Sequence, residues 1–363
     1  MPGIILHNRI LNEAIQYLSK KKKISSITRS VESLMKGNDF RRAAFFGAIG
    51  PNIFDYIPFR KKSLIGSEIS FLIHDGGSTK LISAMLKRLF SLRDHNNEWA
   101  STQRAYLYGF ISHIIADSLF HPFMFYWSGF PEIYKRDQIN HYREQNLLFL
   151  YNMDLYFLHY YEDGEYTYSL NNMLPVKKKR GFLRTNKAIK DFLIGSLMDA
   201  FPKSAKKIIF TQGKKGDYQY SNSFGHIDLF PYCVQCVYLI KKNKNRYFIK
   251  FIETIKRKKI FFSDFIIRYP EPRKINKHIL NLHRERWFYP GGAAGLHYES
   301  VEDLMKISRE QIVDIWEKIE LKATSEDKST GDIMESFQVN ALTGEEKKGY
   351  RDMKLMNPIR IRF

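Results

Sequence analysis

Residues 105–130 read AYLYGFISHIIADSLFHPFMFYWSGF and form the most apolar window of a chain of 363 residues. The window is long enough to cross a bilayer. However, it contains His113, Asp117 and His121, each of which is costly in hydrocarbon, and Pro122 interrupts it. We therefore predict that this window is a buried helix of a globular protein and not a membrane span.

On both sides of this window, apolar residues recur at spacings of three and four, and alternation with a period of two is scarce. The pattern predicts an all-α protein. Residues 47–58, GAIGPNIFDYIP, contain several Gly and Pro residues, which predict a loop. The helices that we expect cover residues 10–18, 69–90 with a break at Gly76-Gly77, 98–120, 137–160, 188–210 with a break at Pro202, 230–240, 247–262 and 301–321.

The composition is that of a globular protein with anionic partners. Its hydrophobic fraction is 44%, and 58 basic against 38 acidic residues leave a formal net charge of +20. This excess favours nucleic acid, phospholipid head groups or acidic protein surfaces, and charge alone does not choose among them. We interpret the basic runs as solvated helix ends or loops, at residues 20–23, 177–180, 241–246 and 256–259.

The cysteines and the N-terminus bear on the cellular compartment. Cys233 and Cys236 form a C-x-x-C pair in apolar, aromatic surroundings, with no second pair to complete a structural zinc site. We interpret them as buried thiols, which fits a reducing compartment. The first residues, MPGIILHNR, lack the pattern of a signal peptide. We therefore expect a protein of the cytoplasm or of the membrane periphery.

The chemistry lies in the segment HIIADSLFHP, residues 113–122. His113 and Asp117 are four residues apart on one helix face, so both can reach one metal ion. His121 continues the row, but eight residues of helix span about 12 Å, too far for all three to share an ion. Pro122 disfavours helical geometry for His121, and we expect the chain to turn there. The segment also fits a polar helix face in which Asp117 is hydrogen-bonded to one histidine.

Further histidines and carboxylates lie at positions that suit a metal centre. His141 and Glu144 are three residues apart, a spacing that di-metal helical bundles use in reverse order. His74 follows an apolar run, His7 opens the first amphipathic segment, and Asp55 lies in the Gly-Pro loop. Imidazole with carboxylate is the ligand set expected for zinc, although iron or manganese also accept it. Their apolar flanks equally fit His7 and His74 as hydrogen-bonded core residues.

In their order along the chain, these elements resemble the zinc-dependent phospholipase C family, especially its bacterial members without a secretion signal. The resemblance covers roughly residues 1–160, and its most specific part is the pattern H-x-x-x-D-x-x-x-H-P. It implies an all-α, multi-helix domain around a cluster of two or three zinc ions. The expected organisation is a helical domain over residues 1–320, with a metal-ligand core at 1–165 and added helices and surface loops at 166–320, and then a partly ordered tail at 321–363.

The resemblance also implies a ligand set, in which Asp117 bridges two ions. One ion would be held by His74, His113 and Asp117, a second by His121, His141 and Glu144, and a third by His7 with the N-terminal end of the chain.

Two departures from the family pattern bear on activity. The family's loop reads Gly-Pro-Asp, where this chain has Gly-Pro-Asn52 with Asp55 three residues later. Asn52 can ligate through its oxygen, but it brings no charge and cannot act as a base. The family's later pair is H-x-x-x-E, whereas here the fourth residue is Gln145 and Glu144 precedes it. Either Asp55 substitutes for the missing aspartate or catalysis is weakened.

The function that the resemblance implies is hydrolysis of a phosphodiester, most simply of a phospholipid to diacylglycerol and a phosphorylated head group. A metal-activated water would attack phosphorus, with Asp55 and Asn52 as the catalytic residues. The expected partners are a phospholipid or another phosphodiester and, at the periphery, an anionic membrane, whereas nucleic acid ranks lower. The sequence sets neither the oligomeric state nor the head-group preference.

Three alternatives stay open. An HD-type phosphohydrolase would use His74-Asp75 but leaves the histidines at 113, 121 and 141 unassigned. A trinuclear zinc nuclease suits the net charge, but the N-terminal tryptophan expected of such enzymes is missing. A catalytically weakened, metal-stabilised helical protein or anionic-lipid binder is kept open by Asn52.

Overall fold

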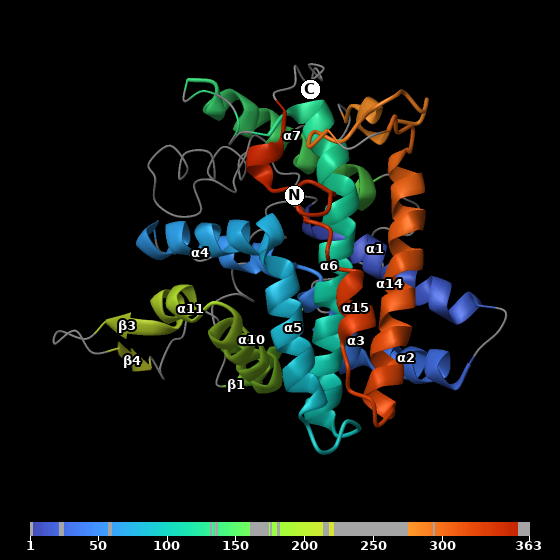
Figure 1. The fold of residues 1–363 in the computed structure, drawn as a ribbon, viewed down its shortest axis with the longest axis vertical. Helices are drawn as coiled ribbons and strands as arrows, with labels where there is room; N and C mark the ends of the chain where they lie inside the picture. The colour runs from blue at the N-terminus through green and yellow to red at the C-terminus, as the bar shows by residue number, and fades with distance from the viewer. Residues whose placement is uncertain are drawn as a thin grey trace.

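A single long helix, α6 (Glu98–Ser128), runs through the middle of the molecule, and the other helices pack around it (Figure 1). The structure is a computed structural model. It describes residues 3–21, 25–56, 60–130, 133, 135, 137–159, 174, 176–179, 182–212, 218–220, 275–292 and 295–354. Within that part of the chain, no helix is both long and apolar enough to traverse a bilayer.

The fold is all-α, as the periodicity predicts. Among the described residues, the helical elements other than α6 are α1 (Ile4–Lys20), α2 (Ser26–Lys36), α3 (Asn38–Gly47), η1 (Gly50–Tyr56), α4 (Arg60–Leu72), η2 (Ile73–Gly77), α5 (Ser78–Phe90), α7 (Ile139–His159), α10 (Lys187–Ala200), α11 (Pro202–Ile209), η5 (Lys277–Leu280), α14 (Val301–Thr324), α15 (Gly331–Glu335) and η6 (Tyr350–Asp352). Short antiparallel pairs join β1 (Val176–Lys179) to β2 (Phe182–Thr185) and β3 (Phe210–Gln212) to β4 (Tyr218–Tyr220).

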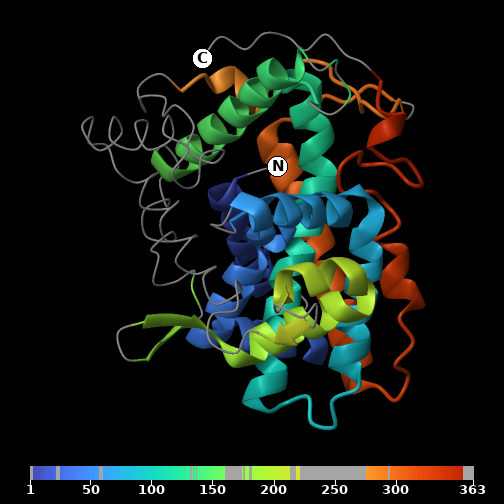
Figure 2. The same cartoon turned by 90° about the vertical axis from the view of Figure 1, so that its left-hand side faces the viewer.

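The position of α6 follows from its ends and its composition. Asn97 caps the first turn, because its side-chain oxygen accepts the N–H of Ala100 at 2.8 Å. Between the caps nearly every residue of α6 is buried, so the helix has neighbours on all sides. Its closest neighbour is α3, since a β-carbon at Gly109 would lie 1.8 Å from the carbonyl oxygen of Ala44. Figure 2 shows α7 crossing one end of α6 and α1.

Two local predictions are wrong. The chain does not turn at His121, because α6 continues through Pro122 to Ser128. Proline removes one backbone hydrogen bond, but Phe123 and Trp127 in the following turn are buried, and their packing holds the helix. The loop predicted over residues 47–58 contains the 3-10 helix η1.

Other predictions of breaks are confirmed. Gly76 interrupts the helix over residues 60–90 with a φ of 86°, and Pro202 separates α10 from α11. The helices predicted over residues 230–240 and 247–262, together with Cys233 and Cys236, lie outside the described residues. The structure describes the tail as far as Lys354, whose N–H donates to the carbonyl of Pro290. The domain boundaries stay a prediction.

Candidate metal centre

Four histidines from α1, η2 and α6 converge on Asp117 in the middle of α6. All five side chains are at most 2% exposed. Oδ1 of Asp117 lies 3.2 Å from Nε2 of His7 and 3.4 Å from Nε2 of His121. Its Oδ2 lies 2.9 Å from Nε2 of both His74 and His113. Asp117 is thus the centre of the cluster, and each of its oxygens faces two imidazoles.

The spacing along α6 explains why His113 and His121 can both reach Asp117. They lie one turn before and one turn after it, so they approach the carboxylate from opposite sides. The two histidines therefore contact different oxygens of Asp117. The helical continuation through Pro122 keeps His121 in this row.

The protein fixes the orientation of three of these rings through their other nitrogen. Nδ1 of His74 donates to the carbonyl of Ser70 at 2.6 Å, and Nδ1 of His113 donates to that of Ala48 at 2.9 Å. Nδ1 of His121 donates to the carbonyl of Ala341 at 2.5 Å. A neutral imidazole that donates from Nδ1 presents a lone pair at Nε2. Metal-bound histidines are commonly held in this way.

The resulting contacts pair acceptors with acceptors. The Nε2 lone pairs face a carboxylate, and Nε2 of His74 and His113 lie only 3.2 Å apart. Among the described residues, neither oxygen of Asp117 and neither nitrogen of His7 has a hydrogen-bond partner. Buried polar atoms left in this state are costly unless a cation lies between them. The donor set therefore fits a metal centre, and one set within it, His7, His113 and Asp117, places its ligand atoms within 4.8 Å of one another.

The protonation states suit the same role. Burial, together with neighbouring His113, lowers the pKa of His7 to about 4, and burial lowers the pKa of His121 well below its usual value. Burial alone would raise the pKa of Asp117, but the surrounding histidines 113, 121 and 7 outweigh it and hold that pKa well below its usual value. For His7, His121 and Asp117 these shifts favour the forms that bind a metal, a neutral imidazole and an ionised carboxylate.

The short helix η1 carries both predicted catalytic residues, and Asp55 lies near His74 of the cluster. Asp55 is buried and accepts a hydrogen bond from Ser70 Oγ at 2.9 Å. Burial raises its pKa, while Ser70, Ser67 and the nearby His74 oppose that rise. Asn52 is 8% exposed, and its Oδ1 has no hydrogen-bond partner among the described residues.

The structure does not bring His141 and Glu144 to the cluster. Both are exposed on the first turns of α7. The buried stripe of this helix passes through Asn146, Phe149 and Met153, and residues 141 and 144 lie on the opposite side of the helix from it.

Three residues that support the centre were not singled out in the sequence. Asp154 on α7 accepts the N–H of Leu6 at 3.1 Å and so anchors the first turn of α1, which carries His7. Gly50 has a φ of 59°, and a β-carbon there would lie 2.3 Å from the ring of His113. The carbonyl of Ala341 holds His121. A lone aspartate among the apolar residues of the second half of α7 was the only sequence signal among them.

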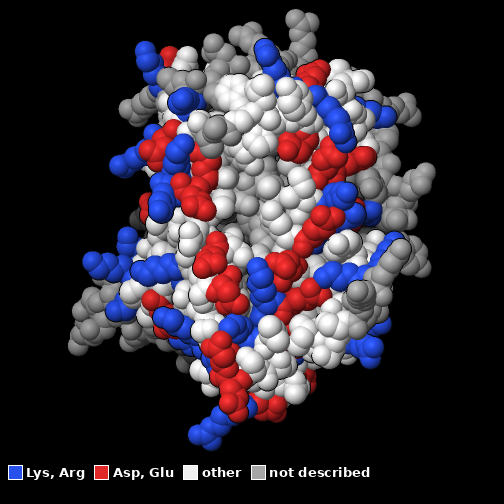
Figure 3. Space-filling view, turned by 45° about the vertical axis from the view of Figure 1, so that its right-hand side comes forward, with Lys and Arg blue, Asp and Glu red and all other residues white. Residues whose placement is uncertain are grey.

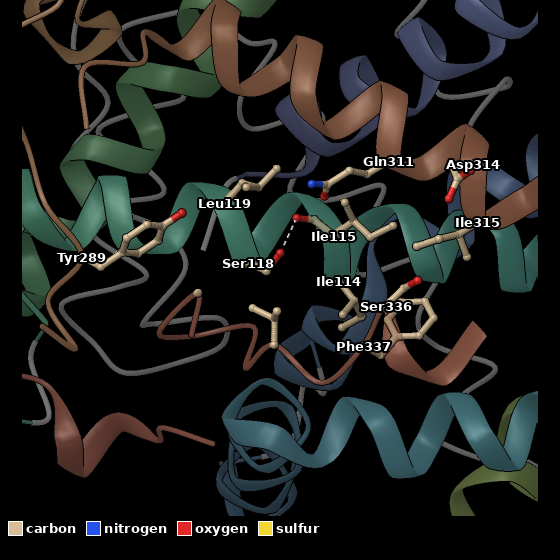
Figure 4. A pocket seen from close by; sticks show the side chains of 12 residues that line it. Ile114, Ile115, Ser118, Leu119, Tyr289, Gln311, Asp314, Ile315, Ser336 and Phe337 are labelled. Carbon is tan, nitrogen blue, oxygen red and sulfur yellow. Dashed lines mark hydrogen bonds between the residues drawn. The ribbon is translucent and has the colours of Figure 1, made fainter. Parts of the chain in front are cut away.

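The opposite face of α6 lines an apolar cleft of about 320 Å³. Its floor is formed by Ile114, Ile115, Ser118 and Leu119, and its walls come from α14 and residues 336–344 (Figure 4). Figure 3 shows this hollow with Asp and Glu side chains along its margins. Lys and Arg side chains are interspersed with the acidic ones on this face, and none of the residues that line the cleft belongs to the cluster around Asp117.

Comparison with known proteins places the cluster within a family. Residues 6–206, more than half of the chain, match the family model described as zinc dependent phospholipase C. This span contains Asp117 and the four histidines around it, and it excludes residues 336–350. Neither the search of curated proteins nor that of solved structures found a match.

Proposed function

The chain belongs to the zinc-dependent phospholipase C family, and on this premise we propose that it hydrolyses phospholipids to diacylglycerol and a phosphorylated head group. The observation that carries the proposal is the buried carboxylate of Asp117, which faces four imidazole nitrogens, three of them on rings whose proton lies at Nδ1 and is donated to a backbone carbonyl. A metal cation between these groups would compensate the cost of burying them.

The ligand distances match one zinc ion in all three ligand pairs and a second ion in the two pairs that include Oδ1 of Asp117. A tetrahedral zinc with bonds of about 2.0–2.1 Å sets its ligand atoms about 3.3 Å apart. The contacts among His74, His113 and Oδ2 of Asp117 are 2.9–3.2 Å, and those of Oδ1 to His7 and His121 are 3.2 and 3.4 Å. Each group of three protein ligands leaves one position for catalysis. A third ion would need ligands beyond these five side chains.

The residues of η1 supply the proton chemistry. When bound, zinc polarises a phosphodiester oxygen and lowers the pKa of a water. Asp55 accepts the proton of the attacking water, and its raised pKa suits a general base. The water oxygen attacks phosphorus, the bond to the glycerol oxygen breaks, and the proton passes from Asp55 to that oxygen. Asn52 orients the water through its free Oδ1.

The charge of the chain supports contact with an anionic membrane. A net charge of +20 attracts the protein to acidic lipids, and salt screens this attraction. We propose a protein that acts at the membrane periphery from the cytoplasmic side.

A weakened enzyme is the second candidate, and Asn52 is the observation that favours it. An amide stands where the family has an aspartate, and an amide cannot take a proton. The protein would then keep zinc and bind lipid while hydrolysing it slowly.

One experiment tests both candidates. Zinc-loaded protein is incubated with phosphatidylcholine vesicles, and diacylglycerol is measured for the wild type, Asn52→Asp and Asp55→Asn. We expect the wild type to release diacylglycerol, Asp55→Asn to lose at least about 100-fold in rate, and Asn52→Asp to gain about 10- to 100-fold. A wild type and an Asn52→Asp variant that both bind zinc but release no diacylglycerol would rule out the phospholipase proposal.

A further inference from the structure

Residues 336–350, which we call the C-terminal strap, run from the end of α15 to the start of η6 and pass close to the metal centre. They lie far outside the span that matches the family. We propose that the strap is a working part of this chain's metal centre and that Asn340 is its positioning residue. The inference rests on the proposed function, because it assumes that the centre holds zinc.

The strap reaches the centre through one hydrogen bond. The ring of His121 is fully buried, and its Nδ1 donates to the carbonyl of Ala341, 220 residues further along the chain. His74 and His113 are oriented differently, because their Nδ1 atoms donate to Ser70 and Ala48 in the family-matching part of the chain. Of these three oriented rings, His121 alone depends on the strap.

Asn340 gives the strap its shape at this point. Its Oδ1 accepts the backbone N–H of Leu342 at 2.8 Å and that of Thr343 at 3.3 Å. Its backbone N–H donates to the carbonyl of Glu345, and its carbonyl accepts the N–H of Gly344. These bonds close a tight turn around Ala341, so the direction of the Ala341 carbonyl follows from the Asn340 side chain.

The same side chain fastens the turn to the other half of the centre. Nδ2 of Asn340 donates to Oδ1 of Asp75 at 3.1 Å, and the N–H of Tyr350 donates to that oxygen at 2.9 Å. Asp75 directly follows His74, which faces the other oxygen of Asp117. The strap is therefore tied through Asn340 and Tyr350 to the residue next to one ligand, and through Ala341 it holds another.

The turn packs closely against α6 at Gly344. Gly344 has a φ of 70°, and a β-carbon there would lie 2.5 Å from the ring of Pro122 and 2.6 Å from the carbonyl oxygen of Ser118. The strap is thus seated against α6 beside His121. Figure 4 shows its first residues, Ser336 and Phe337, on the wall of the apolar cleft.

The expected consequence is unequal binding of the two ions. Loss of an outer hydrogen bond to a ligating histidine typically lowers metal affinity about 10- to 100-fold. Disturbing Asn340 should therefore weaken the ion at His7 and His121 by that factor. The ion at His74 and His113 should be retained, because the backbone carbonyls that hold those rings are elsewhere.

The test measures zinc binding by the full chain against a competing chelator, together with the cobalt(II) absorption spectrum. Asn340→Asp places two carboxylates face to face and should weaken one of two ions about 10- to 100-fold. Pairing it with Asp75→Asn restores a donor between the side chains, so the double variant should recover wild-type affinity. Gln338→Ala, on the exposed part of the same strap, is the matched control and should change nothing.

Asn340→Ser serves if Asn340→Asp does not fold, because a hydroxyl can still accept from residues 342 and 343 but cannot span to Asp75. We expect a weakened ion and an altered cobalt spectrum for this variant as well. Unchanged zinc affinity in the Asn340 variants, or no recovery in the double variant, would overturn the inference while leaving the phospholipase proposal intact. A wild type that binds no zinc would overturn both.

Discussion

The two faces of α6 are made of neighbouring residues but differ in almost every physical property. One face carries His113, Asp117 and His121, which are fully buried and surrounded by further polar ligands. The other carries Ile114, Ile115 and Leu119 and lines an apolar cleft with charged margins. The first face is favourable only when a cation compensates its buried lone pairs. The second gains its stability from apolar packing and needs no partner of opposite charge.

This contrast explains how a helix whose apolar residues are spread evenly around it still has two distinct faces. Both faces are buried, so burial does not distinguish them. What distinguishes them is where the polar groups find partners. The polar face finds imidazoles from α1 and η2, whereas the apolar face meets α14 and the C-terminal strap.

Removing the charge of Asp117 should break the contrast most severely. Asp117→Asn keeps the shape of the side chain but cannot bridge two cations. We expect both ions to be lost, with zinc affinity falling about 1,000-fold or more, since several kcal/mol of charge attraction disappear. Zinc content after dialysis, measured by elemental mass spectrometry, checks this. Asp314→Asn at the margin of the cleft is the control, and an equal loss of zinc there would contradict the distinction between the two faces.

Gly50→Ala should have an intermediate effect on the polar face. The left-handed φ of 59° costs a non-glycine residue about 1 kcal/mol, and the added β-carbon would displace the ring of His113. We expect about a tenfold loss of zinc affinity, measured by chelator competition. Gly331→Ala is the matched control, because a β-carbon there meets nothing within 4 Å. Wild-type affinity in Gly50→Ala would show that His113 is not held by this close approach.

Ile115→Ala should leave zinc binding unchanged and so sharpen the contrast. The side chain is 4% exposed on the apolar face. We expect a loss of about 2 kcal/mol in the free energy of unfolding, because the truncation removes buried methyl groups and leaves a cavity. Urea unfolding of zinc-free protein measures the loss of stability. The zinc content of the purified variant checks that zinc binding is unchanged. A variant that loses zinc would mean that the two faces are mechanically coupled.

Much of the fold could be predicted from sequence patterns, but the ends of elements less well. Apolar spacing predicted α6. Gly and Pro residues predicted the break at Gly76 and the separation of α10 from α11 at Pro202. The rule that proline ends a helix failed at Pro122, because buried aromatic residues in the next turn outweigh one missing hydrogen bond.

The candidate site could likewise be predicted from the sequence only in part. The ligand row on α6 follows from a spacing of four, which helix geometry turns into one face. His141 and Glu144 also had a plausible spacing, yet they are exposed, since spacing does not say which way a helix turns its faces. Whether the five buried side chains bind zinc stays a prediction.

The sequence by itself determined that the chain is all-α and that α6 carries a row of potential ligands, because periodicity and i to i+4 spacing are local properties. Tertiary structure alone decided that His7 and His74 meet that row, that Gly50 admits the ring of His113, and that Ala341 holds His121. These contacts join residues up to 220 positions apart. No local pattern records such distances, because they depend on how whole helices pack.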